Sequence, residues 1–238
     1  MPGIFVTRGS SLRIPAGGLT LPLDGSPPPP VQMELLLELW DRWLEISANQ
    51  TLAAEAAHRR LLEAVKAEDD DRSPALEAEF NSALLATATS AFAIDAFYSA
   101  VKERVPRHPH EEAWAKNRTP REKRIVEVFK LAFALKPEHP EQIGGFLRAL
   151  FTLRGQAVHP PAKYQPPSYH SDLDAGVEWR FIQFTAAKAR AAFDSTSALL
   201  RRLLELPKPE HDELQEWIPS AQSLLAVALG EPPDDAAP

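Results

Sequence analysis

An arginine and a histidine stand five residues apart where a predicted helix must end. Residues 146–159 carry apolar side chains at helical spacing, with Arg154 and His159 near the end and Pro160 directly after it. A proline disfavours helical dihedrals in the preceding residue, so we expect the helix to stop at or just before His159. Five helical steps of about 100° would place the two side chains about 140° apart. An unwound His159 would instead let its imidazole approach the guanidinium of Arg154.

This pair of residue types suits the chemistry of phosphate groups. The Arg154 guanidinium is permanently charged and forked, whereas an imidazole such as that of His159 titrates near neutral pH. Cleavage of RNA by transphosphorylation needs a base for the 2′-hydroxyl, an acid for the leaving oxygen and a cation for the developing charge. One such pair supplies too few groups, but a two-fold dimer supplies two of each. The alternatives are a structural histidine at the helix end and a buried salt bridge of Arg154, for instance to Asp95.

The segment around the pair is locally cationic. Residues 142–171 contain no Asp or Glu, although the chain has 33 acidic residues. Within this window, Arg148, Lys163 and Tyr164 are the candidate binding residues beside the pair. A buried helix followed by a proline-rich loop would also exclude acids, so the absence alone does not establish a binding surface.

Asp95 completes the candidate set, because it lies in the most apolar section of another predicted helix. Its carboxylate is either at the exposed edge of that helix or buried and paired with Arg154 or with an arginine of another helix. A second arginine and histidine, Arg104 and His110, satisfy a looser spacing after the same helix, and we interpret them as surface residues.

Composition limits the classes of function. The formal net charge of −7 argues against strong non-specific binding to nucleic acid, so an RNA-binding role must be confined to one site. The chain has no cysteine, no recognisable metal-ligand set, no Gly-rich phosphate loop and no nucleophile-elbow motif, so we expect no metal and no cofactor. There is no secretory h-region and no run of about 18 apolar residues, which predicts a cytoplasmic protein without a membrane span.

The remaining elements are predicted to form an antiparallel helical bundle, an all-α fold, behind a short irregular or β-prone N-terminal arm. The arm and its proline-rich linker take residues 1–30, the bundle residues 31–229 and a disordered tail residues 230–238. The predicted helices are 31–48 and 51–66 (separate or joined), 74–105, 121–136, 140–159, 171–206 and 209–229, with one helical turn expected inside 111–117 and an extended loop at 160–170. Helix starts are expected at Ser73, at the Thr119–Glu122 capping-box sequence and at Ser171.

The motif Leu-Arg154-Gly-Gln-Ala-Val-His159, with Phe-Ala-Ile-Asp95-Ala-Phe on a preceding core helix, resembles the HEPN superfamily over about residues 74–206. Many members of that family are metal-independent ribonucleases in which two protomers pair their Arg-His motifs across a shared cleft. The resemblance implies that His159 acts as general base or acid and that Arg154 holds the scissile phosphate. Two positions depart from the family pattern, namely Gly155, where Asn or Asp is usual, and Pro161, where some toxin members carry Tyr.

Two functions follow as expectations. The first is a homodimeric, metal-independent endoribonuclease, of the kind found in defence or toxin–antitoxin systems, with RNA as substrate and an antitoxin as a possible protein partner. The second is a non-catalytic protein of the same fold that binds RNA, a nucleotide or a protein partner.

Overall fold

The computed structural model describes residues 7–19, 22, 29–159 and 163–231, and the chain divides into two compact units, Met1–Leu39 and Trp40–Pro238. In the first unit, β1 (Ser10–Arg13) pairs with β2 (Glu34–Leu37) in an antiparallel hairpin. An ion pair between Arg13 and Glu34, 2.6 Å from Nε to Oε2, closes one end of it. The β-prone character predicted for the arm is thus confirmed at β1, whereas the pieces expected at 4–7 and 19–22 and the spacer at 26–30 lie wholly or partly outside the described residues.

The helix predicted to begin at Val31 begins instead at Trp40, the first residue of α1 (Trp40–Lys66). The leucines before it belong to β2, because a short apolar run does not by itself distinguish a strand from a helix, and here β1 offers hydrogen-bonding partners. α1 is one continuous helix. Its polar residues at the expected break are satisfied internally, since Ser47 donates to the Ala86 carbonyl and Thr51 donates to the Ser47 carbonyl.

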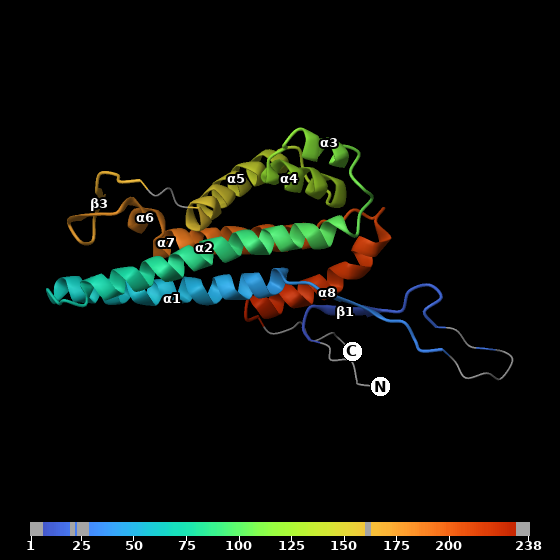
Figure 1. Cartoon of the computed structure of the whole chain (residues 1–238), viewed down its shortest axis with the longest axis horizontal. Helices are drawn as coiled ribbons and strands as arrows, with labels where there is room; N and C mark the ends of the chain where they lie inside the picture. Colours follow the sequence, from blue (N-terminus) through green and yellow to red (C-terminus); the bar gives the residue numbers. More distant parts are fainter. Residues whose placement is uncertain (1–6, 20–21, 23–28, 160–162, 232–238) are drawn as a thin grey trace. The chain divides into compact units, whose positions relative to one another are not determined.

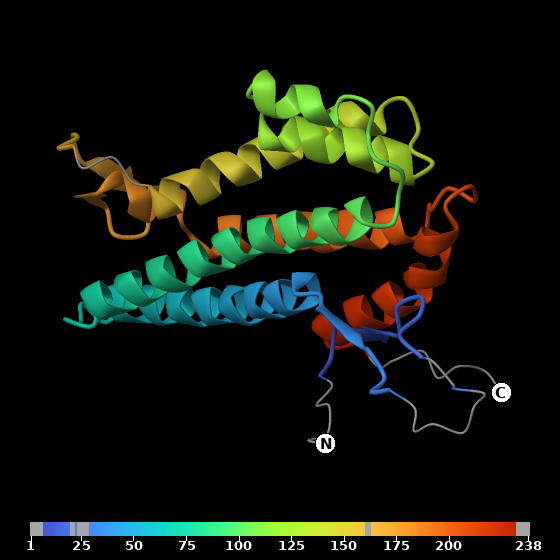
Figure 2. The ribbon, with the colours of Figure 1, turned by 45° about the vertical axis from the view of Figure 1, so that its right-hand side comes forward.

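The second unit is mostly helical, which confirms the predicted all-α class. α1 and α2 (Arg72–Lys102) form a long antiparallel hairpin, and α7 (Ala186–Leu204) packs along both (Figures 1 and 2). α4 (Arg121–Ala132) and α5 (His139–Val158) lie together against α2, on the side away from α1 (Figure 2). α8 (Asp212–Ala228) contacts α1 and α7, and the short α3 (Glu111–Lys116) is the helical turn expected before α4.

Two predicted helix caps are not formed. α2 begins at Arg72, before Ser73, and its N-cap Asp71 makes no side-chain hydrogen bond to the helix. α4 begins after Pro120, also without a side-chain cap, so the capping box is absent. Instead the Thr119 backbone carbonyl accepts a hydrogen bond of 2.7 Å from Arg124 Nε, which ties the helix start to a side chain one turn ahead.

Aromatic residues from five parts of the unit form the main core. The buried rings are those of Trp40, Phe97, Phe129, Phe133 and Trp217, with centroids 5.4 Å apart for Trp40 and Phe97 and 5.7 Å for Phe97 and Trp217. Edge-to-face and tilted ring pairs at such distances stabilise the core beyond the contribution of their buried apolar area. This core fixes α4 and α8 against α1 and α2, and hence the N-terminal half of α5.

A second, smaller core made largely of alanine lies nearer the turn between α1 and α2. Its buried members are Ala54, Ala83, Ala86, Phe184, Ala186 and Ala189, with Ala157 packed against them. Alanine side chains let backbones approach closely, so the end of α5 and the start of α7 come together on the α1–α2 hairpin. Of the candidate residues, Arg154 and His159 stand at this end of α5.

The prediction of a single helix over residues 171–206 is wrong. The segment forms a β-hairpin of β3 (Ser168–His170) and β4 (Ala175–Val177), then α6 (Trp179–Gln183), and only then α7. Asp174 adopts a φ of +47° in the hairpin turn, a conformation that is incompatible with a helix continuing through it. Thr185 has an extended backbone that separates α6 from α7. It caps α7, because its side-chain oxygen accepts a hydrogen bond from the Lys188 N–H.

Gly230 and Glu231, the first two residues of the predicted tail, belong to the described part of the chain. Glu231 is tied to the bundle by an ion pair with Arg201 of α7, 2.6 Å long, and residues 232–238 lie outside the described part of the chain. Among the described helices, α2 is long and apolar enough to cross a membrane by composition, but 67% of its most apolar window is buried in the fold. Burial in the bundle is sufficient to explain that composition.

Candidate functional site

α5 ends where the sequence predicts. Its last helical residue is Val158, and His159 follows with φ −128° and ψ 59°, outside the helical region. The His159 N–H still donates to the Gly155 carbonyl over 2.8 Å, so its backbone remains attached to the last turn. The His159 side chain is exposed. The imidazole is therefore available to a ligand or to another subunit.

Arg154, one turn earlier, is a half-buried cation without a counter-ion. Its guanidinium carbon lies 5.4 Å from the centroid of the Phe92 ring on α2, and that ring is held by Trp43 at 5.3 Å. Arg154 Nε is buried and has no hydrogen-bond partner. In the described ranges no carboxylate forms a salt bridge with Arg154. An uncompensated guanidinium is unusual in a protein of net charge −7, and its electrostatics favour an anion.

The salt bridge considered between Asp95 and Arg154 is not formed. Asp95 is partly exposed and pairs with Arg121 of α4, over 2.6 Å from Nε to Oδ1. The same guanidinium lies over the Tyr98 ring, 4.4 Å from its centroid. Asp95 thus has the partner on another helix that the sequence analysis allowed, and it does not neutralise Arg154.

The approach of the His159 imidazole to the Arg154 guanidinium stays a prediction. Throughout the described part of the chain, no hydrogen bond joins these two side chains. The retained hydrogen bond from the His159 N–H to the Gly155 carbonyl keeps the backbone of His159 close to the helical path. One protomer therefore presents the cation and the imidazole as separate groups.

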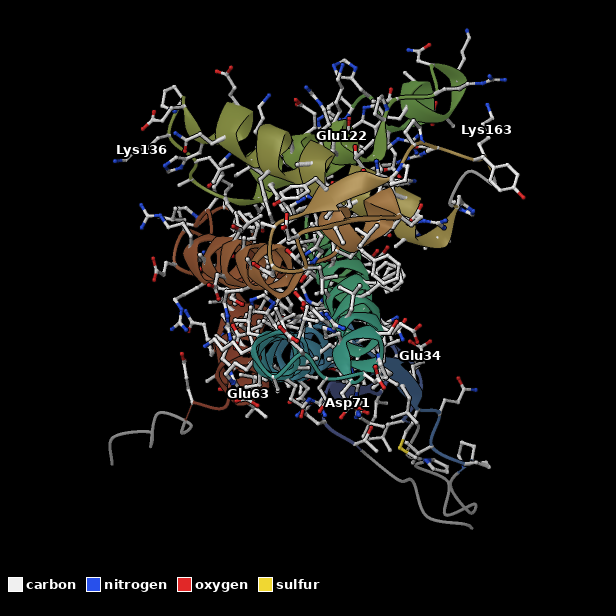
Figure 3. All side chains as sticks on the ribbon, turned by 90° about the vertical axis from the view of Figure 1, so that its left-hand side faces the viewer. Glu34, Glu63, Asp71, Glu122, Lys136 and Lys163 are labelled. Carbon is white, nitrogen blue, oxygen red and sulfur yellow. The ribbon has the colours of Figure 1, made fainter. Side chains whose placement is uncertain are left out.

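The other candidate binding residues lie on either side of this helix end. Arg148 is exposed on α5. Lys163 and Tyr164 line a hollow of about 420 Å³ together with Trp179 and Arg180 of α6. The Tyr164 side chain is fully exposed, and Figure 3 shows Lys163 pointing outward from its loop. Cations beside exposed aromatic rings are the groups that hold single-stranded nucleic acid.

The motif Arg104…His110 does not form a second site of this kind. Arg104 is partly buried rather than a surface residue, with its guanidinium carbon 4.6 Å from the Trp217 centroid, and it donates to the Ala100 carbonyl over 2.6 Å. His110 is exposed. The two residues nevertheless offer a matched control for Arg154 and His159, since both arginines stack on a ring near a helix end.

A group of polar residues that the sequence analysis missed lies beside the second core. Glu79 on α2 is buried, and its carboxylate accepts hydrogen bonds from the Ala186 N–H at 2.8 Å and from His58 Nδ1 at 3.0 Å. His58 thereby carries its proton on Nδ1 when it is neutral, which leaves Nε2 as an acceptor. His170, only 5% exposed, lines the same hollow of about 370 Å³.

A signal for this group was present in the sequence. Ala75, Glu79 and Ala83 occupy one face of α2, so Glu79 takes a core position between two alanines. His58 stands about as far before the turn between α1 and α2 as Glu79 stands after it, and such positions face each other in an antiparallel helix pair. A carboxylate in a core position requires a donor, and His58 was the residue placed to supply one.

Unpartnered buried polar atoms gather in this region. Arg154 Nε, Gln156 Oε1 and His170 Nδ1 are all buried without a hydrogen-bond partner. Leaving such an atom unsatisfied costs about 1–3 kcal/mol, so each of them favours a bound water or ligand. They lie at the end of α5 and in the hairpin that follows it.

In the described ranges no group of three or more His, Cys, Asp or Glu residues is placed to hold a metal ion. Comparison with known proteins finds no matching family model, no matching curated protein and no matching solved structure.

Proposed function

We propose that this protein binds RNA through the phosphate backbone and cleaves it without a metal ion, using Arg154 and His159 in a cleft formed by two copies of the chain. The observation that carries the proposal is the guanidinium of Arg154, held over Phe92 without a carboxylate partner among the described residues. A cation held in this way at the end of α5 is positioned to bind a phosphate oxygen. The exposed imidazole of His159 follows five residues later.

The chemistry needs two imidazoles. In the proposed cleft, His159 of one protomer removes the proton from the ribose 2′-hydroxyl, and the 2′-oxygen attacks the phosphorus. The bond from phosphorus to the 5′-oxygen breaks, and His159 of the second protomer gives its proton to that oxygen. The products are a 2′,3′-cyclic phosphate and a 5′-hydroxyl, while the two Arg154 guanidinium groups neutralise the charge that develops on the phosphate.

The surroundings support this reading. Arg148 and Lys163 add positive charge on either side, and Tyr164 offers a ring for an unstacked base. The resemblance of the Arg154–His159 motif to the HEPN superfamily points to the same reaction. Asp95, which the sequence analysis placed in the binding set, contributes indirectly, because its bond to Arg121 leaves Arg154 free for substrate.

The test is RNA cleavage in EDTA by purified protein. We expect wild type to cleave and both Arg154→Ala and His159→Ala to lose at least about 100-fold of the rate, as the removal of an acid–base or charge-stabilising group does. Arg104→Ala and His110→Ala are the matched controls and should keep wild-type activity, provided that thermal melting shows them folded. Cleavage that persists in either Arg154→Ala or His159→Ala would overturn the proposal.

A second candidate is a non-catalytic protein of the same construction, which binds RNA, a nucleotide or a protein partner such as an antitoxin. The observation that favours it is the lack of any hydrogen bond between Arg154 and His159 within the described protomer. The oligomeric state separates the two candidates. The paired-site reaction requires a dimer, and a protein that stays monomeric at about 100 μM in sedimentation experiments would favour the non-catalytic candidate.

A further inference from the structure

The hollow beside Glu79 has the features of a binding site rather than of a packing defect. It encloses about 370 Å³ and is lined from four parts of the fold, by His58 of α1, His170 of β3, Asp172 of the hairpin turn and Thr185 before α7, among others. His170 is 5% exposed, and its Nδ1 has no hydrogen-bond partner. A buried imidazole left unsatisfied at the wall of a cavity indicates a missing polar partner.

The wall is also held in place by specific contacts. Glu79 joins α2 to the first residue of α7 and to His58, so three helices are fixed around one carboxylate. On the opposite side, the Tyr169 hydroxyl donates to Asp174 Oδ1 over 2.9 Å, which also raises the pKa of Tyr169. The hollow is therefore organised before any ligand arrives.

Two simple ligand classes, a phosphate anion and a metal ion, fit this hollow poorly. The lining residues include no Lys or Arg but two carboxylates, those of Glu79 and Asp172, so a phosphate group would meet net repulsion. A metal ion is disfavoured because the described residues offer no group of three ligands at suitable spacing. The lining of two carboxylates and two imidazoles suits a small organic molecule that carries several hydrogen-bond donors and acceptors and no phosphate.

A nucleobase belongs to that class. Asp172 can accept from an exocyclic amine, Thr185 can donate or accept, and His170 Nδ1 awaits a partner, while Ile182 and Ala187 supply apolar surface for the faces of the base. We propose that this hollow is a specificity pocket that receives one unstacked base of the RNA strand. The inference rests on the proposed function for the identity of the polymer, but the pocket itself is separate from Arg154 and His159.

The position of the hollow along α2 fits this role. Phe92, under Arg154, and Glu79, at the hollow, are 13 residues apart on one helix, which is about 20 Å at 1.5 Å per residue. A strand bound at the end of α5 can therefore extend toward the hollow with a base a few nucleotides from the scissile phosphate.

The test uses the four free ribonucleosides, which carry a base and no phosphate. Titration is followed by the imidazole NMR signals of the histidines. We expect one nucleoside, with an amino group on its base, to shift the signals of His58 and His170 saturably, and Asp172→Asn to weaken that binding at least about 10-fold. Glu77→Gln, which alters an exposed carboxylate of α2, is the matched control and should leave the binding unchanged. Arg154→Ala should also leave it unchanged, because the nucleoside has no phosphate.

Three results would overturn the inference. The first is the absence of saturable shifts with every nucleoside at millimolar concentration. The second is equal binding by wild type and Asp172→Asn, provided both are folded by circular dichroism. The third is a response of the His58 and His170 signals to inorganic phosphate or to Zn²⁺ alone, which would assign the hollow to an anion or a metal. RNA cleavage without nucleoside binding would refute the base pocket and leave the nuclease proposal standing. Nucleoside binding without RNA cleavage would refute the nuclease proposal and leave the base pocket standing.

Discussion

Asp95 of α2 is bound to Arg121 of α4, with 2.6 Å between Oδ1 and Nε. This ion pair occupies the carboxylate that the sequence placed closest to the candidate site, and it leaves Arg154 facing a ring instead of an acid. The choice of partner by a carboxylate therefore decides whether a nearby arginine is held in a salt bridge or stays available to a ligand.

The pair should contribute little to stability. Both side chains are 40% exposed, so Arg121→Ala is expected to lower the free energy of unfolding by no more than about 1 kcal/mol. Urea denaturation measures this. Because the freed Asp95 would then be an unpaired acid near α5, RNA affinity should fall as well, and Asp95→Asn in the same background should restore it. Unchanged RNA affinity in Arg121→Ala would show that Asp95 has no influence on the site.

The ring of Phe92 should matter for RNA binding. Phe92→Leu keeps much of the volume but removes the π face beneath Arg154, and a partly exposed cation–π contact contributes about 0.5–1 kcal/mol. We expect RNA affinity to fall about 2–5-fold at fixed salt. Fluorescence anisotropy with a labelled single strand measures it. Phe181→Leu is a suitable control, since that ring packs on Phe80 and none of the described arginines stacks on it, and an equal loss there would remove the special role of Phe92.

Glu79 should be a stability residue as well as part of the hollow. Its side chain is 3% exposed and satisfies two donors, so Glu79→Ala leaves the Ala186 N–H and His58 without a partner. The expected cost is about 2–4 kcal/mol of unfolding free energy. Glu77→Ala, at an exposed position of the same helix, should stay within about 0.5 kcal/mol of wild type. Equal effects of the two substitutions in denaturant unfolding would contradict the buried-partner account.

Low pH should weaken the ion pair between Glu55 of α1 and Arg190 of α7. The hydrogen bond from Arg190, 2.7 Å from Nε to Oε1, lowers the pKa of Glu55 below its ordinary value of 4.5. A carboxyl whose folded pKa is depressed adds stability above its unfolded pKa and loses it as pH falls through the folded pKa. Both side chains are about one-third exposed, with 29% for Glu55 and 35% for Arg190, so the contribution is about 0.2–1 kcal/mol. Wild type should exceed Glu55→Gln in stability at pH 7, and the gap should close below pH 4.5. A gap that stays constant with pH would be inconsistent with this ion pair.

Much of the fold follows from local features of the sequence. Pro160 places the end of α5 at His159, and the apolar periodicity locates α2, α5 and α8. β2 of the arm and the hairpin after α5 were misassigned, because the leucines of β2 and the segment around Val177 have no local signal that separates a strand from a helix. Their pairing partners, and not their own composition, decide their conformation.

The candidate site was predictable in part. Arg154 and His159 were proposed from spacing and charge and stay a prediction. The partner of Asp95 was left open, since the choice between Arg121 and Arg154 depends on how α4 and α5 pack on α2. The pairing of Glu79 with His58 is a contact between helices that only the register of the α1–α2 hairpin fixes. The packing of the whole core sets this register and the way in which α4 and α5 pack on α2.

The most direct measurement of the central claim is the cleavage of matched oligonucleotides in EDTA by wild-type protein, with the chemical ends of the products identified by mass spectrometry. Our account predicts that RNA is cut to 2′,3′-cyclic phosphate and 5′-hydroxyl ends, that the same strand with 2′-deoxyribose throughout stays intact, and that Arg154→Ala and His159→Ala cut neither. Cleavage of the deoxy strand, 5′-phosphate products, or no cleavage by a folded dimer would contradict it.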